Sequence, residues 1–87
     1  MNIIQESYMP KVMTTSGAVV GGRGGLLGGF LCTTSGTLQL RDGDASGTVI
    51  VPSVAVSAGV YYPMPFGFST GLYAELTGAQ GTFGVLS

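Results

Sequence analysis

Short runs that alternate apolar and polar residues fill roughly the last fifty positions of the chain, and Gly, Ser and Asp residues separate the runs. In 37–41, Leu38 and Leu40 fall on one face of an extended chain and polar residues fall on the other. Period-two alternation of this kind predicts half-buried β-strands. The same pattern predicts strands over 71–77 and 82–86.

Prolines shape two further predicted strands. The segment 48–56 is rich in β-branched residues but contains Pro52, which suits an edge, a bulge or a break between two strands, and we favour the break. The segment 60–66 carries Pro63 and Pro65, two residues apart. Both prolines remove backbone donors from the same side of the strand, so that side is expected to be unpaired.

The first part of the chain has a less regular pattern. We predict an extended N-terminal arm over 1–10 and a single β-domain over 11–87, beginning with a strand at 11–15. Glycines over 21–29 disfavour a helix and predict a loop that leads into a bulged strand at 26–34. Roughly six to eight short strands predict an all-β fold, either a small antiparallel β-sandwich or a jelly-roll-like barrel.

Composition indicates that the domain needs support from a partner. The chain has 87 residues, enough for one small domain with a thin core, and 16 of them are glycine. Its single cysteine, Cys32, excludes an intrachain disulfide, and the absence of histidine argues against a zinc site. Oligomerisation is the remaining common support for so small a domain.

The charged residues disfavour several function classes. The net charge is −1 and only 8% of residues are charged, so no basic patch is expected and nucleic acid is not an expected partner. Without histidine the usual nucleophile and base pairs cannot form, and Cys32 is expected to be a buried apolar residue. The glycine cluster lacks the spacing of phosphate-binding loops. We therefore predict a protein that is not an enzyme and has no cofactor.

No membrane partner is expected either. The N-terminus carries Glu6 and Pro10 where a secretory signal needs an apolar run, so the chain is expected to stay in the cytoplasm. The most apolar stretch, 17–32, contains Arg23 and is shorter than the roughly 20 residues that span a bilayer. A glycine-rich membrane-active peptide, such as a bacteriocin or holin, is the remote alternative that depends on this stretch.

One loop has the beginning of a calcium-binding pattern. Asp42, Asp44 and Ser46 place oxygen atoms at alternate positions, and Gly47 supplies a turn. The twelfth position is Ser53 instead of the glutamate that completes such a loop, and the flanking segments are predicted strands. We favour a hairpin loop of turn residues and keep the calcium site as the alternative.

Aromatic and proline residues gather in 60–68. Alternation predicts that Tyr62, Met64 and Phe66 face the core and that Tyr61 faces outward with the two prolines. Tyrosine offers a large contact area at small entropic cost, so the outward set is a candidate subunit interface. Apolar residues of the arm are further candidates. The full set of interface candidates is Ile3, Ile4, Tyr8, Met9, Tyr61, Pro63 and Pro65.

Four segments carry a resemblance to a known group of proteins. They are GTLQLRDG, SGTVI, AGVYYPMPF and GLYAELTGAQGTF, within a region of about 50 of the 87 residues. In these segments the chain resembles the short Gly/Thr/Ala-rich β-proteins encoded among the structural genes of tailed bacteriophages. The first 35 residues lie outside the resemblance.

The resemblance implies a β-sandwich or jelly-roll component of the virion, often trimeric, and supplies no catalytic residues. The function it implies is that of a capsid decoration or cement protein, assembled in the host cytoplasm. The expected partners are other copies of the chain, as a homotrimer, and the major capsid protein. A tail or head-fibre accessory protein of the same fold, bound to a tail protein, is the alternative.

Overall fold

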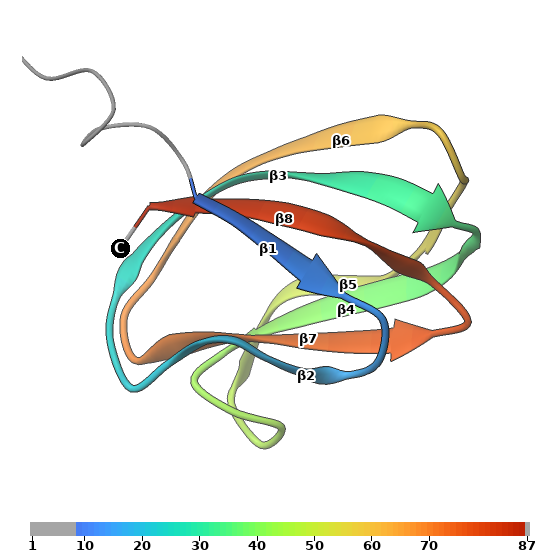
Figure 1. The fold of residues 1–87 in the computed structure, drawn as a ribbon. Coiled ribbons are helices and arrows are strands. Elements are labelled where there is room, and N and C mark those ends of the chain that lie inside the picture. Colours follow the sequence, from blue (N-terminus) through green and yellow to red (C-terminus); the bar gives the residue numbers. More distant parts are fainter. Residues whose placement is uncertain (1–8, 87) are drawn as a thin grey trace, which may run out of the picture.

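The computed structural model describes residues 9–86, and these form eight β-strands and no helix (Figure 1). The strands follow one another through short turns, as the spacing of Gly, Ser and Asp residues predicts. Their bounds are β1 Met9–Met13, β2 Gly17–Gly21, β3 Gly25–Thr34, β4 Gly36–Asp42, β5 Thr48–Val56, β6 Tyr61–Phe68, β7 Gly71–Thr77 and β8 Gln80–Leu86.

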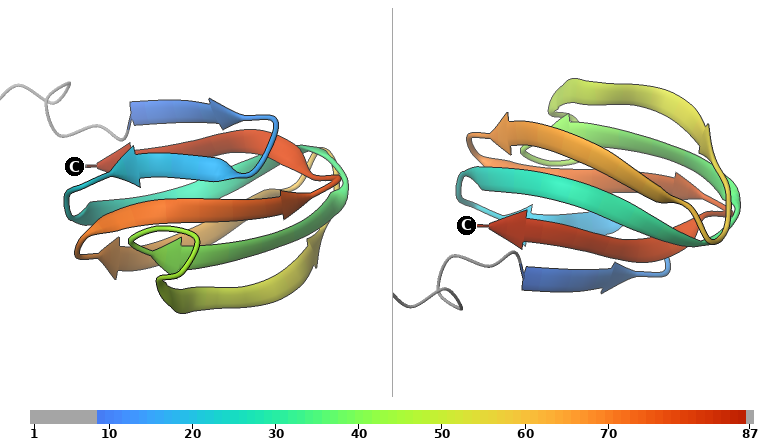
Figure 2. Two further views of the ribbon diagram at one scale, coloured as in Figure 1. Left: turned by 90° about the horizontal axis from the view of Figure 1, so that it is seen from below. Right: turned by 90° about the horizontal axis from the view of Figure 1, so that it is seen from above.

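The strands form two four-stranded antiparallel sheets that pack face to face (Figure 2). We call them sheet A, with strand order β1-β8-β3-β6, and sheet B, with strand order β2-β7-β4-β5. The all-β fold and the antiparallel sandwich that the alternation predicts are therefore confirmed. No two neighbouring strands of sheet A follow each other in the sequence, so this sheet contains no local hairpin.

The core lies between the two sheets and is formed by the inward apolar positions of all eight strands. Phe30 of β3 and Phe83 of β8 lie at its centre, are fully buried and have ring centroids 4.5 Å apart. The buried apolar residues are Met13, Val19, Val20, Leu27, Phe30, Cys32, Leu38, Leu40, Val56, Met64, Phe68, Leu72, Ala74, Ala79, Phe83 and Val85.

A β-bulge at Gly28 and Gly29 changes which side chains of β3 point into the core. The register of β3 with β8 shifts between Leu27 and Gly29, so one extra residue is accommodated in β3. Leu27 and Phe30 are three residues apart and both are buried, which strict alternation does not allow. The predicted bulged strand at 26–34 is thus confirmed.

Several predicted boundaries are wrong. Residues 1–8 and 87 lie outside the described part of the chain, and the remaining two residues of the predicted arm, Met9 and Pro10, belong to β1. The predicted loop over 21–29 is too long, because β3 already begins at Gly25. Strand β2 was not predicted, since five residues flanked by glycines give little periodicity.

The prediction that Pro52 breaks 48–56 into two strands is also wrong. Strand β5 runs through Pro52 because it is an edge strand of sheet B, where one side of the backbone needs no partner. The register with β4 shifts between Leu38 and Leu40, so the proline lies at an irregularity in the ladder. The edge and bulge interpretations both apply, and the break does not.

Strand β6 is one of the two edge strands of sheet A and pairs only with β3, so one side of this strand is unpaired, as predicted. Met64 is buried and Tyr62 is half-buried, as predicted. Phe66 was predicted to be in the core but is 43% exposed, because it lies at the open edge of the sandwich. Phe68, two residues further along, is buried instead.

Candidate interaction surface

The outer face of sheet A is built from cross-strand rows of uncharged residues. One row crosses all four strands: Val12 pairs with Thr82, Thr82 with Leu31, and Leu31 with Tyr61. A second row, beside the first, joins Pro10, Gly84, Gly29 and Pro63, and a third row joins Leu86, Leu26 and Gly67. We call these eleven residues the neutral face, because none of them is Lys, Arg, Asp or Glu.

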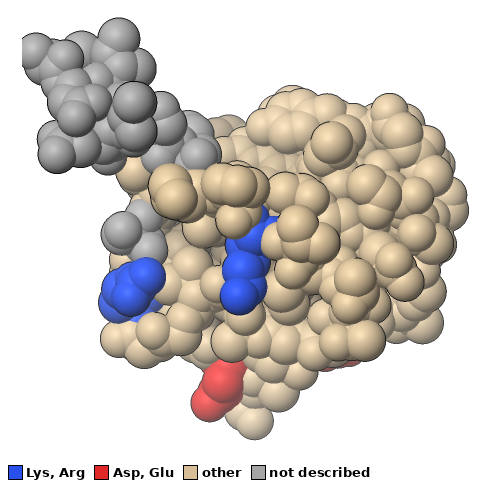
Figure 3. Space-filling view, in the orientation of Figure 1, with Lys and Arg blue, Asp and Glu red and all other residues tan. Residues whose placement is uncertain are grey.

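Large apolar side chains on the neutral face are exposed to solvent. Val12 is 67% exposed, Tyr61 56% and Leu31 43%. An antiparallel sheet that faces water on one side normally alternates apolar and polar residues, so exposed apolar residues on the outer side make this face a candidate contact surface. In Figure 3 the upper surface of the molecule, over β3 and β6, shows no charged side chain.

The Tyr61 side chain extends from β6 over β3 on the neutral face. Its hydroxyl donates a hydrogen bond to the carbonyl oxygen of Gly28, 3.4 Å away, so the ring lies across β3. A Cβ atom at Gly29 would collide with this ring. The glycine therefore leaves room for the Tyr61 ring over β3, where the ring is exposed on the neutral face.

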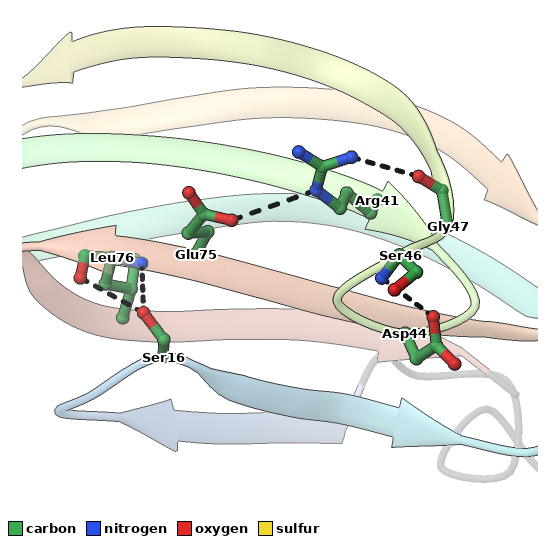
Figure 4. A network of polar contacts seen from close by, with 7 residues as sticks. All are labelled: Ser16, Arg41, Asp44, Ser46, Gly47, Glu75 and Leu76. Carbon is green, nitrogen blue, oxygen red and sulfur yellow. Dashed lines mark hydrogen bonds and ion pairs between the residues drawn. The ribbon is translucent and has the colours of Figure 1, made fainter.

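The outer face of sheet B is polar by comparison. Arg41 on β4 and Glu75 on β7 form an ion pair, with 3.8 Å between Nε and Oε1 (Figure 4). Arg41 also donates from Nη1 to the carbonyl oxygen of Gly47, at 3.1 Å. Thr37, Gln39, Tyr73 and Thr77 alternate with the buried residues of the same two strands. The two central strands of sheet B thus alternate buried apolar and outward polar residues, and Val49 of the edge strand β5 is an exposed apolar residue on the same face.

The structure distributes the predicted interface residues over different surfaces. Tyr61 and Pro63 lie on the neutral face, and Pro65 is exposed further along β6. Met9 pairs with the inward-facing Val85, so it lies on the opposite side of sheet A, at its edge, where it is exposed. Ile3, Ile4 and Tyr8 lie outside the described residues.

Sequence reasoning did not select three of the main contributors to the neutral face, Val12, Leu26 and Leu31. Their signal is present in the chain: 26–32 has apolar residues at both outward and inward positions, a pattern typical of a strand covered on both faces. The bulge at Gly28 obscured it, because the outward positions do not follow a single alternation.

The candidate calcium residues have structural roles in the hairpin between β4 and β5. The Asp42 carboxylate accepts hydrogen bonds from the backbone N–H groups of Thr70 and Ser69 and from the Thr70 hydroxyl, at 3.0–3.1 Å. The hydrogen bonds from Thr70 N–H, and next from Ser69 N–H, hold the pKa of Asp42 below its usual value of 3.8. Asp42 therefore connects this hairpin to the turn between β6 and β7.

Asp44 also bonds within the loop. Its Oδ1 atom accepts a hydrogen bond from the backbone N–H of Ser46, at 2.8 Å (Figure 4). Its carbonyl oxygen accepts one from Gly47 N–H, at 2.9 Å. The first contact forms an Asx turn and the second closes a β-turn, which matches the hairpin interpretation. Among residues 9–86 no group of three or more His, Cys, Asp or Glu side chains is arranged to hold a metal ion.

The remaining candidate features lie inside the sandwich. Cys32 is fully buried, as predicted, and its thiol donates to the carbonyl oxygen of Thr34 at 3.1 Å. The apolar stretch 17–32 forms β2, a turn and most of β3. Within the described residues there is no pocket, and no helix is long and apolar enough to cross a membrane.

Comparison of the chain with protein-family models, with curated proteins and with solved structures finds no match.

Proposed function

We propose that this protein is a non-enzymatic structural component of a bacteriophage virion. In this proposal it is a capsid decoration or cement protein that binds the major capsid protein as a small oligomer. The resemblance in 36–86 supports the bacteriophage assignment. The neutral face supports the part of the proposal that concerns contact with other subunits.

Within this proposal the sandwich is a jelly roll. Jelly rolls consist of eight strands in two sheets and contain two Greek keys. The strand orders β1-β8-β3-β6 and β2-β7-β4-β5 support this assignment, because the first and last strands are neighbours in one sheet and β2 and β7 are neighbours in the other. Many virus capsid domains share this architecture.

The neutral face is the single observation that carries the proposed function. A small enzyme or ligand-binding domain keeps its polar groups around a pocket, whereas this molecule places an entire uncharged sheet face at the surface. Each copy then contributes apolar burial of roughly 25 cal/mol per Å². Attachment as an oligomer adds avidity, so many modest contacts strengthen a shell.

The direct test is decoration of capsids in solution. Capsids of the parent phage assembled without this protein are mixed with the purified protein and separated by sedimentation. We expect the protein to sediment with the capsids up to a fixed number of copies per shell, and decorated capsids to withstand higher temperature. A protein that stays in the supernatant at every concentration would contradict the proposal.

The arm supplies a second contact in this proposal. Ile3, Ile4 and Tyr8 are apolar and belong to the segment that precedes β1. Deletion of residues 1–8 is expected to weaken capsid binding while the circular dichroism spectrum of the β-domain is retained. Undiminished binding after the deletion would remove the arm from the proposal.

A tail or head-fibre accessory protein is the second candidate. It is favoured by the exposure of Tyr61, Pro63 and Phe66 along β6, since aromatic residues and prolines at an exposed edge suit a protein or glycan ligand. The number of copies per purified virion separates the two candidates. Hundreds of copies support decoration of the capsid, and a handful support a tail component.

A further inference from the structure

We propose that the neutral face binds a second copy of this chain, with the neutral faces of the two copies packed against each other about a two-fold axis. The inference deepens the proposed function, on which it rests, because it names the surface through which the oligomer forms. Four features support it: the charge of the face, its shape, the blocked strand edges and the polar character of sheet B.

Charge favours self-association of this face. In a two-fold contact each residue near the axis meets the same residue of the partner, so any charged residue there would meet a like charge. The neutral face has no charged residue among its eleven positions, and Lys11, the nearest in sequence, pairs with the inward-facing Phe83 on the other side of the sheet. The face is therefore electrostatically compatible with itself.

Shape supports the same arrangement. The Tyr61 ring reaches over Gly29, and the middle row of the face contains two glycines, Gly29 and Gly84, which have no side chain to project from the sheet. A level apolar sheet can pack against another sheet about 10 Å away, as the two sheets do inside the sandwich. A two-fold contact would thus repeat the packing that already forms the core.

The strand edges are poor sites for self-association. Sheet A ends at β1 and β6, which contain Pro10 and the pair Pro63 and Pro65. Sheet B ends at β5, which contains Pro52, and at β2, which has five residues and a register shift. Prolines, bulges and short strands prevent edge-to-edge pairing, so two copies meet more readily through a face.

Sheet B is the less suitable face. In a two-fold contact through sheet B, Arg41 and Glu75 would be buried, and burial of such an ion pair costs solvation that its mutual attraction seldom exceeds. The outer face of sheet B can remain in water or meet a polar partner such as the capsid. Self-association and capsid binding can then use different surfaces.

The size of the face predicts a reversible pair. Four strands at ~4.8 Å spacing and about seven residues at ~3.3 Å give a footprint of roughly 20 by 23 Å. This is smaller than the ~800 Å² per partner of a standard interface, so the pair should dissociate on dilution. The two-fold pair also differs from the trimer that the family resemblance implies, and one measurement separates them.

The test compares two charge substitutions in the full chain. Leu31→Glu places a carboxylate near the centre of the neutral face, and Val49→Glu places one on the outer side of β5, opposite Arg41. The two positions are matched, since Leu31 is 43% exposed and Val49 39%. Sedimentation velocity over a concentration series gives the oligomeric state and the dissociation constant of each protein.

We expect the unmodified protein and Val49→Glu to dimerise equally. Leu31→Glu should raise the dissociation constant at least about tenfold, which corresponds to ~1.4 kcal/mol. If the circular dichroism spectrum shows that Leu31→Glu does not fold, the dissociation constant of Thr82→Arg tests the proposed pair in its place. Thr82 is a partly exposed polar residue of the central strand β8, so an isolated domain accommodates arginine there and the proposed pair does not.

Three results would overturn the inference. They are an unmodified protein that is monomeric at every concentration, a trimer, or a dimer that none of the neutral-face substitutions weakens. Capsid sedimentation of the same proteins keeps the two proposals apart. A monomer that still binds capsids contradicts the inference and the oligomeric state in the proposed function, but not capsid decoration. A dimer that binds no capsid contradicts the proposed function but not the inferred pair.

Discussion

Gly81 shows how a single small residue permits the central contact of the core. It lies in β8 between Met13 of β1 and Cys32 of β3. A Cβ atom at this position would collide with the backbone carbonyl oxygen of Leu31 and with the ring of Phe30. The ring of Phe30 therefore occupies the space that a side chain at position 81 would need, and close packing requires the glycine.

We expect Gly81→Ala to lower the free energy of unfolding by about 1–3 kcal/mol or more, because overpacking against backbone atoms cannot be relieved by a rotamer change. Gly21→Ala is the matched control. An added Cβ at Gly21 meets no atom within 4 Å, so this variant should be neutral or slightly more stable. Urea denaturation measures both, and equal stability of the two variants would contradict the packing argument.

Asp42 is the residue whose charge contributes to folding in a pH-dependent way. Hydrogen bonds from Thr70 N–H, Ser69 N–H and the Thr70 hydroxyl stabilise the carboxylate in the folded chain, and its pKa is lowered. A lowered pKa means that the contribution to stability is complete above the pKa of the unfolded chain. The contribution is lost as the pH falls through the folded pKa.

We therefore expect the melting temperature of Asp42→Asn to lie below that of the unmodified protein at neutral pH, and the difference to shrink below about pH 4. Thermal melts followed by circular dichroism across this range measure the difference. Asp44→Asn is the control, because an asparagine Oδ1 can still accept the hydrogen bond from Ser46 N–H. A difference for Asp42→Asn that is constant with pH would show that its charge is not involved.

At the scale of elements, the edges of the sheets explain where the prolines are placed. Pro52 lies in edge strand β5, and Pro63 and Pro65 lie in edge strand β6, each next to a shift in register.

The turn between β1 and β2, which connects sheet A to sheet B, is held by hydrogen bonds to β7. Ser16, which precedes β2, donates from its hydroxyl to the carbonyl oxygen of Leu76 and accepts from Leu76 N–H (Figure 4).

We expect the double substitution Pro63→Thr and Pro65→Thr to promote aggregation, because it restores two backbone N–H groups on an exposed edge. Light scattering during prolonged incubation measures the effect. Phe66→Thr is the control, since it introduces the same side chain into β6 without restoring a donor. If the double variant stays as soluble as the control, the prolines do not protect this edge.

Elements also show the limits of prediction from the sequence. Strong alternation located β4 and β7, and the paired prolines revealed that one side of β6 is unpaired. Strand β2 has only five residues, and its strand character comes from pairing with β7. The sequence permits three contexts for Pro52, which are an edge strand, a bulge and a break. The choice among them depends on whether β5 lies at the edge of a sheet.

On the scale of the whole molecule, the two outer faces of the sandwich differ. Sheet B exposes polar residues and the pair Arg41 and Glu75, whereas sheet A exposes the neutral face. A thin core and many glycines limit the stability of one domain, so burial of the neutral face would add stability that the isolated chain lacks.

If the neutral face is buried between copies, folding and association are coupled. We expect the melting temperature of the unmodified protein to rise with protein concentration, because association stabilises only the folded chain. The melting temperature of Leu31→Glu should rise less with concentration, because its dimer is weaker. Calorimetry at several concentrations measures both, and a melting temperature of the unmodified protein that is independent of concentration would contradict the coupling.

The sequence by itself determined the β-class of the chain, the approximate position of most strands, the unpaired side of β6 and the low charge of the surface. These properties follow from alternation, proline chemistry and composition, which are local. Only the tertiary structure decided which outer face is uncharged, how the bulge directs Leu27 and Phe30 inward, and that Thr70 and Ser69 bind Asp42. Alternation assigns each residue to one of two sides of a strand but does not specify which distant strand lies beside it.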